Sequence, residues 1–154
     1  MKIFAALCFL ICPLFIEAQV AISISAAKRQ GLTVEHLDSV YKSAIHAEAD
    51  KAVFKTDKER EKLALAYRSF LIDFGSFLSK NSFKWDETTR GWNRIYMQPD
   101  GTIDYFLYSV KNLIPAKEAE FERLLNLYIK DNKFGLTAPV KFAQCSSVTY
   151  PKSE

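Results

Sequence analysis

The chain has 154 residues, 49% of them hydrophobic and 25% charged, with a formal net charge of +3 at pH 7. This length fits one domain, and so small a charge with both signs interspersed excludes the clustered basic face of a nucleic-acid-binding protein. The one dense run of charges, Lys55 to Lys62, alternates in sign and is typical of a solvated helix start.

The first eighteen residues have the pattern of a cleaved export signal. Lys2 provides the positive start, Ile3 to Ile16 form a nearly unbroken apolar run, and Ala18 is the small residue before the cut. This run of about fourteen residues is shorter than the roughly twenty that span a bilayer core. We therefore expect residues 1–18 to be removed, and residues 19–154 to form a single α+β domain in the periplasm or outside the cell, without a stable membrane anchor.

The cysteines support no disulfide within the mature chain. Cys8 and Cys12 leave with the signal, so that Cys145 is the one remaining thiol. Cys12 could alternatively accept a lipid, but the bulky residues 9–11 before it lack the small side chains of a lipoprotein signal.

Two helices are expected over residues 33–80. Apolar residues at spacings of three and four begin at Thr33 and predict a first amphipathic helix: Val34, Leu37, Tyr41, Ala44 and Ile45. Thr56 and Glu59 then form a capping-box pattern, which predicts a second helix over Asp57–Lys80. Its apolar face comprises Leu63, Tyr67, Phe70, Leu71, Phe74, Phe77 and Leu78.

A β-hairpin follows, with strands at Trp92–Gln98 and Thr102–Val110. Pro99, Asp100 and Gly101 suit a type I turn followed by a left-handed glycine bulge. This loop predicts a register in which Met97, Ile95 and Asn93 lie opposite Ile103, Tyr105 and Leu107, and Tyr96, Arg94 and Trp92 lie opposite Asp104, Phe106 and Tyr108.

The C-terminal part predicts one more helix and one more strand. Pro115 suits a first helical turn, Gly135 is expected to end the helix, and its apolar stripe comprises Phe121, Leu124, Leu125, Tyr128 and Ile129. Val140–Tyr150 predicts a strand that Pro151 ends. One face of this strand holds Val140, Phe142, Val148 and Tyr150, and the other holds Ala143 and Cys145.

These elements predict an α+β fold in which two N-terminal helices pack on a small antiparallel sheet of order β-β-α-β over residues 92–150. Both sheet faces are apolar, so we expect the long second helix to cover one face and the C-terminal helix the other. Core packing is then the favoured role of five aromatic residues, with a ligand-binding platform as the alternative: Trp85, Trp92, Tyr96, Phe106 and Tyr108.

The run from Trp92 through Pro99, Asp100 and Gly101 to the helix at Phe121 and the last strand resembles the C-terminal domain of TonB and related envelope proteins. This resemblance covers less than half of the mature chain. The energy transducers of that family also have an uncleaved anchor and a Pro-rich spacer, which this chain lacks.

The resemblance implies a stand-alone envelope domain that contacts another protein, through an edge strand that accepts a partner strand. Ser146, Ser147 and Thr149 lie on the last strand, which is the candidate edge. The alternative is an ordinary edge that Lys141 and Pro151 protect from pairing.

No catalytic, cofactor or metal site is expected. Cys145 could act as a nucleophile, but only His36 and His46 could assist it, and these residues have no metal-ligand spacing. A small buried or half-buried thiol is the favoured interpretation of Cys145. Asp86, Glu87 and Asp104 show no pairing across a cleft. The chain also lacks phosphate-binding, dinucleotide-binding, serine-hydrolase and zinc-protease motifs.

Arg90, Trp92, Arg94 and Tyr96 form a second candidate interaction cluster, because arginine beside aromatic residues is typical of binding hot spots. Alternatively, Arg94 pairs with Asp104 across the hairpin and the rings are buried. The sequence therefore favours a non-enzymatic protein-interaction module with a partner in the cell envelope. The alternative is a carrier of a small molecule or lipid, with an apolar cavity between helices and sheet.

Overall fold

The computed structural model describes residues 19–153. The expected signal, residues 1–18, lies outside this range. The described part has four helices: α1 (Ile24–Arg29), α2 (Val34–Val40), α3 (Asp57–Lys80) and α4 (Pro115–Asp131). Its five strands are β1 (Val20–Ser23), β2 (Lys42–Ser43), β3 (Thr89–Met97), β4 (Ile103–Val110) and β5 (Phe142–Tyr150). None of these helices is long and apolar enough to cross a membrane.

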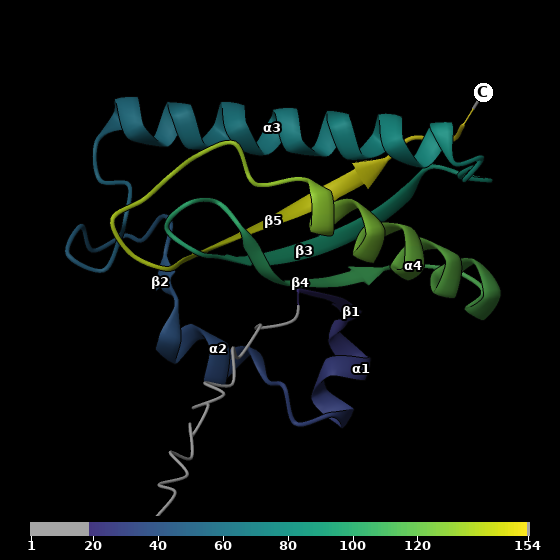
Figure 1. Ribbon diagram of the computed structural model, residues 1–154, viewed down its shortest axis with the longest axis horizontal. Helices are drawn as coiled ribbons and strands as arrows, with labels where there is room; N and C mark the ends of the chain where they lie inside the picture. The colour runs from purple at the N-terminus through teal and green to yellow at the C-terminus, as the bar shows by residue number, and fades with distance from the viewer. Residues whose placement is uncertain (1–18, 154) are drawn as a thin grey trace, which may run out of the picture.

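The strands form one mixed sheet in the order β1-β4-β3-β5-β2 (Figure 1). β3 lies at the centre and pairs antiparallel with β4 and β5, whereas β1 and β2 pair parallel with β4 and β5. The predicted fold of two N-terminal helices on a small antiparallel β-β-α-β sheet is therefore wrong. The prediction lacked β1 and β2, which have four and two residues. Strands this short show no clear alternation of apolar and polar residues in the sequence.

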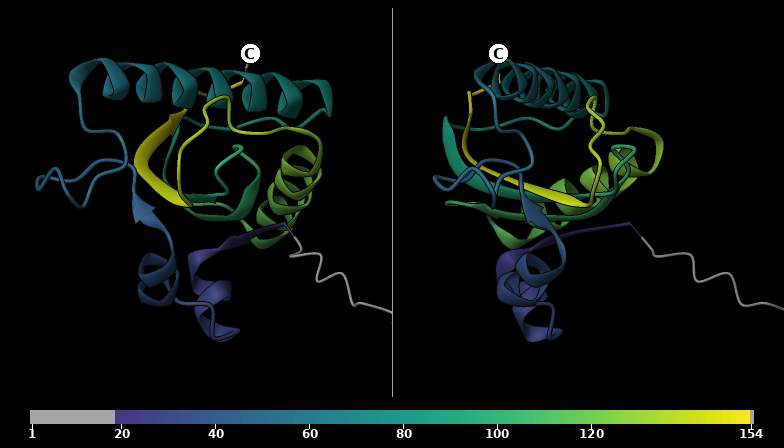
Figure 2. Two further views of the ribbon diagram at one scale, coloured as in Figure 1. Left: turned by 60° about the vertical axis from the view of Figure 1, so that its left-hand side comes forward. Right: turned by 90° about the vertical axis from the view of Figure 1, so that its left-hand side faces the viewer.

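The helices are also distributed differently from the prediction. α3 and α4 lie together on one face of the sheet, and α1 and α2 lie on the other (Figures 1 and 2). The reason is the aromatic contact between α3 and α4, because the Phe74 ring lies 5.7 Å from Phe121 and 5.1 Å from Tyr128. Two helices that bury their apolar stripes against each other cannot lie on opposite faces of one sheet.

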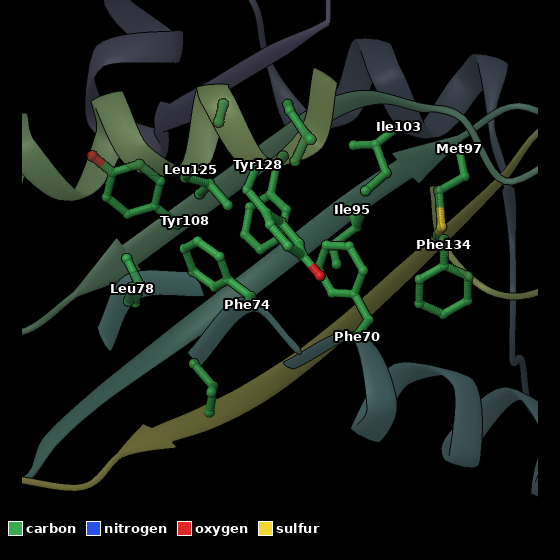
Figure 3. Packing of buried hydrophobic residues seen from close by; sticks show 14 of the residues in the cluster. Phe70, Phe74, Leu78, Ile95, Met97, Ile103, Tyr108, Leu125, Tyr128 and Phe134 are labelled. Atoms are coloured by element: carbon green, nitrogen blue, oxygen red, sulfur yellow. The ribbon is translucent and has the colours of Figure 1, made fainter. Parts of the chain in front are cut away.

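The long helix α3 has the predicted bounds, and its capping box between Thr56 and Glu59 is present. Phe70, Phe74 and Leu78 are buried, and Phe70 and Phe74 point toward Tyr128 of α4 and the sheet (Figure 3). The apolar stripe predicted for α4 is buried as well, but α4 ends at Asp131 rather than at Gly135. Its cap is Asn132, whose side-chain amide donates to the Tyr128 carbonyl.

The first predicted helix is much shorter than its apolar repeat. α2 ends at Val40, and the chain then runs extended to pair with β5, with the Lys42 amide donating to the Lys141 carbonyl and the Ala44 amide to the Ala143 carbonyl. The Tyr41 hydroxyl donates to Asp104 over 2.5 Å in the protein interior. These contacts with distant residues stabilise the extended chain more than a continued helix would be stabilised by its own modest intrinsic propensity.

The hairpin turn matches the prediction, with Gly101 at a φ of 82° and the Gln98 amide bonded to the Thr102 carbonyl. The predicted register is correct only at Met97 and Ile103. Asp104 is an extra residue in β4, so Tyr96 lies opposite Tyr105 and Ile95 opposite Phe106. The bulge gives the buried Asp104 carboxylate two donors, Tyr41 and Gln98, and it turns both Ile103 and Phe106 toward the core under α3 and α4.

Core packing was expected for five aromatic residues, and the structure shows it for four of them. Trp85, Tyr96, Phe106 and Tyr108 are buried, so core packing is confirmed for them. Trp92 is only half-buried.

Replacing Phe70 by alanine is expected to lower the free energy of unfolding by about 3–5 kcal/mol, because its ring is 4% exposed and contacts rings of β4, α4 and the loop after α4. Chemical denaturation measures this change. Leu65→Ala is the matched control, since Leu65 lies on the same helix and is 61% exposed. Equal effects of the two variants would contradict the assigned helix face.

Gly101→Ala is expected to cost more than about 1 kcal/mol of stability, because alanine disfavours positive φ and its Cβ would lie 2.2 Å from the Phe134 carbonyl oxygen. Gly135→Ala is the control, since nothing lies within 4 Å of a Cβ at that position and its φ is not positive. Thermal unfolding of the two variants compares them, and equal midpoints would argue against the glycine turn.

Candidate interaction site at the edge of the sheet

The two outer edges of the sheet differ in how their backbone groups are satisfied. Beside β1, the Asn126 side chain of α4 accepts from the Ala21 amide over 2.9 Å and donates to the Ala21 carbonyl over 2.7 Å. The Glu122 carboxylate accepts from the Ser23 amide over 3.1 Å. Side chains of α4 therefore replace a neighbouring strand at this edge.

The opposite edge is open over most of its length. β2 pairs with β5 only at Phe142 and Ala143, and no strand of the described residues pairs with the outer side of residues 144–150. We call this stretch the β5 free edge. The Lys141 and Ala143 carbonyls face β2. Because backbone groups alternate in direction along a strand, the amides of Cys145, Ser147 and Thr149 also face outward.

The β5 free edge itself carries no charge and no proline, because Lys141 and Pro151 lie outside it. Residues 142–150 contain no charged residue and no proline, although charges and prolines are the common means of protecting an exposed edge. Two side chains bond to outward carbonyls of their own strand, Gln144 to Cys145 and Ser146 to Ser147, each over 3.0 Å. These weak local bonds leave the outward amides available to a partner strand.

A groove of about 830 Å³ lies between α3 and the end of β5. Figure 1 shows α3 running above the C-terminal half of β5. We call this groove the α3–β5 groove. Its lining is mainly apolar or small: Tyr67, Leu71, Ile72, Gly75, Ser76, Ser79, Trp85, Val148, Thr149, Tyr150, Pro151 and Ser153. The charged residues in the lining are Arg68, Lys80 and Lys152.

One end of the groove is held rigidly. The Trp85 and Tyr150 rings stack with centroids 4.4 Å apart and an interplanar angle of 12°. Beside them, Ser153 exchanges two hydrogen bonds of 2.9 Å with the backbone of Trp85. The strand end and the residues after it are therefore fixed in place, which is favourable for a binding surface that is already formed.

A buried polar cluster lies where the groove meets the sheet. The Asn93 side-chain amide donates to the Tyr150 hydroxyl over 3.4 Å, and the Tyr67 hydroxyl and the Asn93 Oδ1 atom have no hydrogen-bond partner among the described residues. Burial raises the pKa of Tyr67, and the nearby Asn93 and Ser146 side chains offset this rise only in part. Burial likewise raises the pKa of Tyr150. Both phenols are therefore neutral at physiological pH.

Four of the candidate residues from the sequence lie together on the other face of the sheet. Arg90 lies opposite Thr149, and Trp92 lies opposite Ser147. With Gly91, Ser109, Lys111 and Val148 they line a groove of about 520 Å³, which we call the open-face groove. Val148 and Thr149 line both grooves, so the free edge lies between them.

The other three candidate residues lie elsewhere. Arg94 donates to the Asp38 carboxylate of α2 over 2.6 Å, and the fully buried Tyr96 donates to the same carboxylate over 3.0 Å. Burial disfavours the charge of Arg94, but the hydrogen bonds and charge interactions with Asp38 and Tyr96 together outweigh burial and raise its pKa. Burial raises the pKa of Tyr96. Arg94 does not pair with Asp104, so that part of the alternative is wrong, whereas the Tyr96 ring is buried as the alternative supposed. Ser146 lies opposite Asn93, next to the buried polar cluster.

The groups considered for catalysis are not assembled into a site. Cys145 is exposed, contrary to the expectation of a buried or half-buried thiol. Asp86 forms an ion pair with Lys117, while Asp104 is buried with Tyr41 and Gln98. Within residues 19–153 no three or more His, Cys, Asp or Glu side chains are grouped so that they could hold a metal ion.

Sequence reasoning missed the contribution of α3 to this site. The groove depends on the small residues Gly75, Ser76 and Ser79 on one side of the helix. The one signal was Gly75 itself, because a glycine inside a helix costs about 1 kcal/mol relative to alanine and usually has a reason in packing or function.

Comparisons of the chain with models of protein families, with curated proteins and with solved structures found no match.

Proposed function

We propose that this protein is exported and acts as a non-enzymatic interaction module, similar in use to the C-terminal domain of TonB, by adding a strand of a partner protein to the β5 free edge. The observation that carries the proposal is the unpaired, uncharged outer side of residues 144–150. Main-chain hydrogen bonds supply affinity in this mode of recognition, and pockets beside the edge supply specificity.

The contrast between the two edges supports this proposal. Bonds from Asn126 and Glu122 satisfy the backbone of β1, so an open edge is no general property of this sheet. At the β5 free edge, the outward amides of Cys145, Ser147 and Thr149 can donate hydrogen bonds to an added strand. No charged residue of β5 would repel that strand.

The alternative is a carrier of a small molecule or lipid, and the α3–β5 groove is the observation that favours it. A volume of about 830 Å³ is sufficient for a drug-sized ligand. The carrier alternative places an apolar cavity between α3 and the sheet, but this space is occupied by buried side chains such as Phe70, Phe74 and Leu125 (Figure 3). The groove lies beside the free edge, where it can receive the side chains of an added strand.

Export rests on the pattern of residues 1–18. When the full chain is expressed in a Gram-negative host, we expect the periplasmic fraction to hold a protein whose intact mass corresponds to a chain that begins at Gln19. A Leu10→Arg variant, which interrupts the apolar run, is expected to remain as an uncleaved precursor in the cells. Full-length wild-type protein in the cytoplasmic fraction would contradict export.

Strand addition is tested by selecting binders from a displayed library of random peptides. Ser147→Pro removes one outward amide without touching a bond to β3, and proline is tolerated at an edge. Selected peptides are expected to bind this variant about tenfold more weakly than wild type, because a buried peptide carbonyl loses its donor.

Ser147→Ala is the matched control and is expected to bind like wild type, and circular dichroism verifies that both variants are folded. Bound peptides are also expected to slow hydrogen exchange of the Cys145, Ser147 and Thr149 amides. Equal affinity for the proline and alanine variants would rule out strand addition at this edge.

A further inference from the structure

We propose that the segment bound at the β5 free edge is an extended peptide in which apolar residues alternate with acidic residues. This inference rests on the proposed function and specifies the chemical class of its partner. It follows from the different character of the two grooves that flank the free edge and from the charges that line both of them.

The alternation follows from sheet geometry. Val148 and Tyr150 point to the face of the sheet covered by α3 and α4, as their place in the core shows, whereas Ser147 and Thr149 point to the opposite face. Side chains of an added strand alternate in the same way. Every second side chain of the partner would therefore enter the α3–β5 groove, and the side chains between them would lie over the open-face groove.

The α3–β5 groove selects apolar side chains. Leu71, Trp85 and Val148 form apolar walls, and Gly75 leaves space on the helix, since nothing lies within 4 Å of a Cβ at that position. Burial of the partner's side chains here removes apolar surface from water. Ile72, which is 58% exposed, would be covered by the same contact.

The charges around the edge select acidic residues. Arg68, Lys80 and Lys152 line the α3–β5 groove, Arg90 and Lys111 line the open-face groove, and no acidic residue lines either. None of these five cations forms an ion pair with another described residue. Their combined potential attracts an acidic segment and repels a basic one.

Three heptapeptides, each acetylated and amidated at its ends, test the inference. Valine alternates with glutamate in the first, with lysine in the second and with glutamine in the third. Binding is measured by calorimetry, and the bound position by exchange of the Cys145, Ser147 and Thr149 amides. We expect the glutamate peptide to bind about tenfold more tightly than the lysine peptide and to weaken as salt is added. The double variant Arg90→Gln, Lys111→Gln removes the charges of the open-face groove, over which the acidic side chains would lie, and is expected to reduce this difference.

Gly75→Leu tests the groove. Leucine is the better helix former and has room at this position, so the variant is expected to fold at least as stably as wild type while its side chain fills the groove and weakens peptide binding. Ser69→Leu is the control, because Ser69 is an exposed residue of α3 that does not line the α3–β5 groove. Equal binding to both variants would overturn the role of the groove.

The outcomes separate this inference from the proposed function. Equal affinity for all three peptides, with protection of the β5 amides, would retain strand addition and overturn the acidic preference. No protection by any of the three peptides would overturn the inference, and no protection by the peptides selected from the library would overturn strand addition as well. Laurate that binds wild type but not Gly75→Leu, without protecting the β5 amides, would also overturn both and would favour the carrier.

Discussion

Backbone amides and carbonyls at the edge of a sheet need hydrogen-bond partners, and the two edges of this sheet meet that requirement in different ways. At one edge, α4 provides side chains to β1. At the other, β2 covers only Phe142 and Ala143 and then leaves the sheet. The sheet therefore has one edge whose backbone is satisfied by side chains and one edge whose outer side pairs with no strand of the described residues.

The position of α3 leaves a groove beside the open edge. Phe70 and Phe74 pack against Tyr128 and Phe121 of α4, and this packing holds α3 beside α4. The small side chains of Gly75, Ser76 and Ser79 then leave the space between helix and strand unfilled. The same aromatic packing therefore stabilises the core and leaves a groove beside the edge.

The bulge at Asp104 shows how far a buried polar group can determine a register. A regular hairpin would have placed Ile95 opposite Tyr105, with Asp104 opposite Tyr96. The extra residue instead brings the carboxylate to Tyr41 and Gln98 and puts Ile95 opposite Phe106. Tyr41 also ends α2, so one buried carboxylate is connected both to the hairpin register and to the early end of that helix.

The sequence alone determined the elements that have strong local signals: the bounds and cap of α3, the apolar stripe of α4, the glycine turn at Gly101 and the strand character of β5. It also indicated Ser147 and Thr149 as edge residues and grouped Arg90 with Trp92. Only the tertiary structure decided the pairing of β1 and β2, the placement of α3 and α4 on one face, the bulge, and the open groove. The reason is physical: a cap, a turn or a helical stripe depends on residues a few positions apart, whereas these other features depend on contacts between residues as distant as Ala21 and Asn126, which leave no periodic trace in the chain.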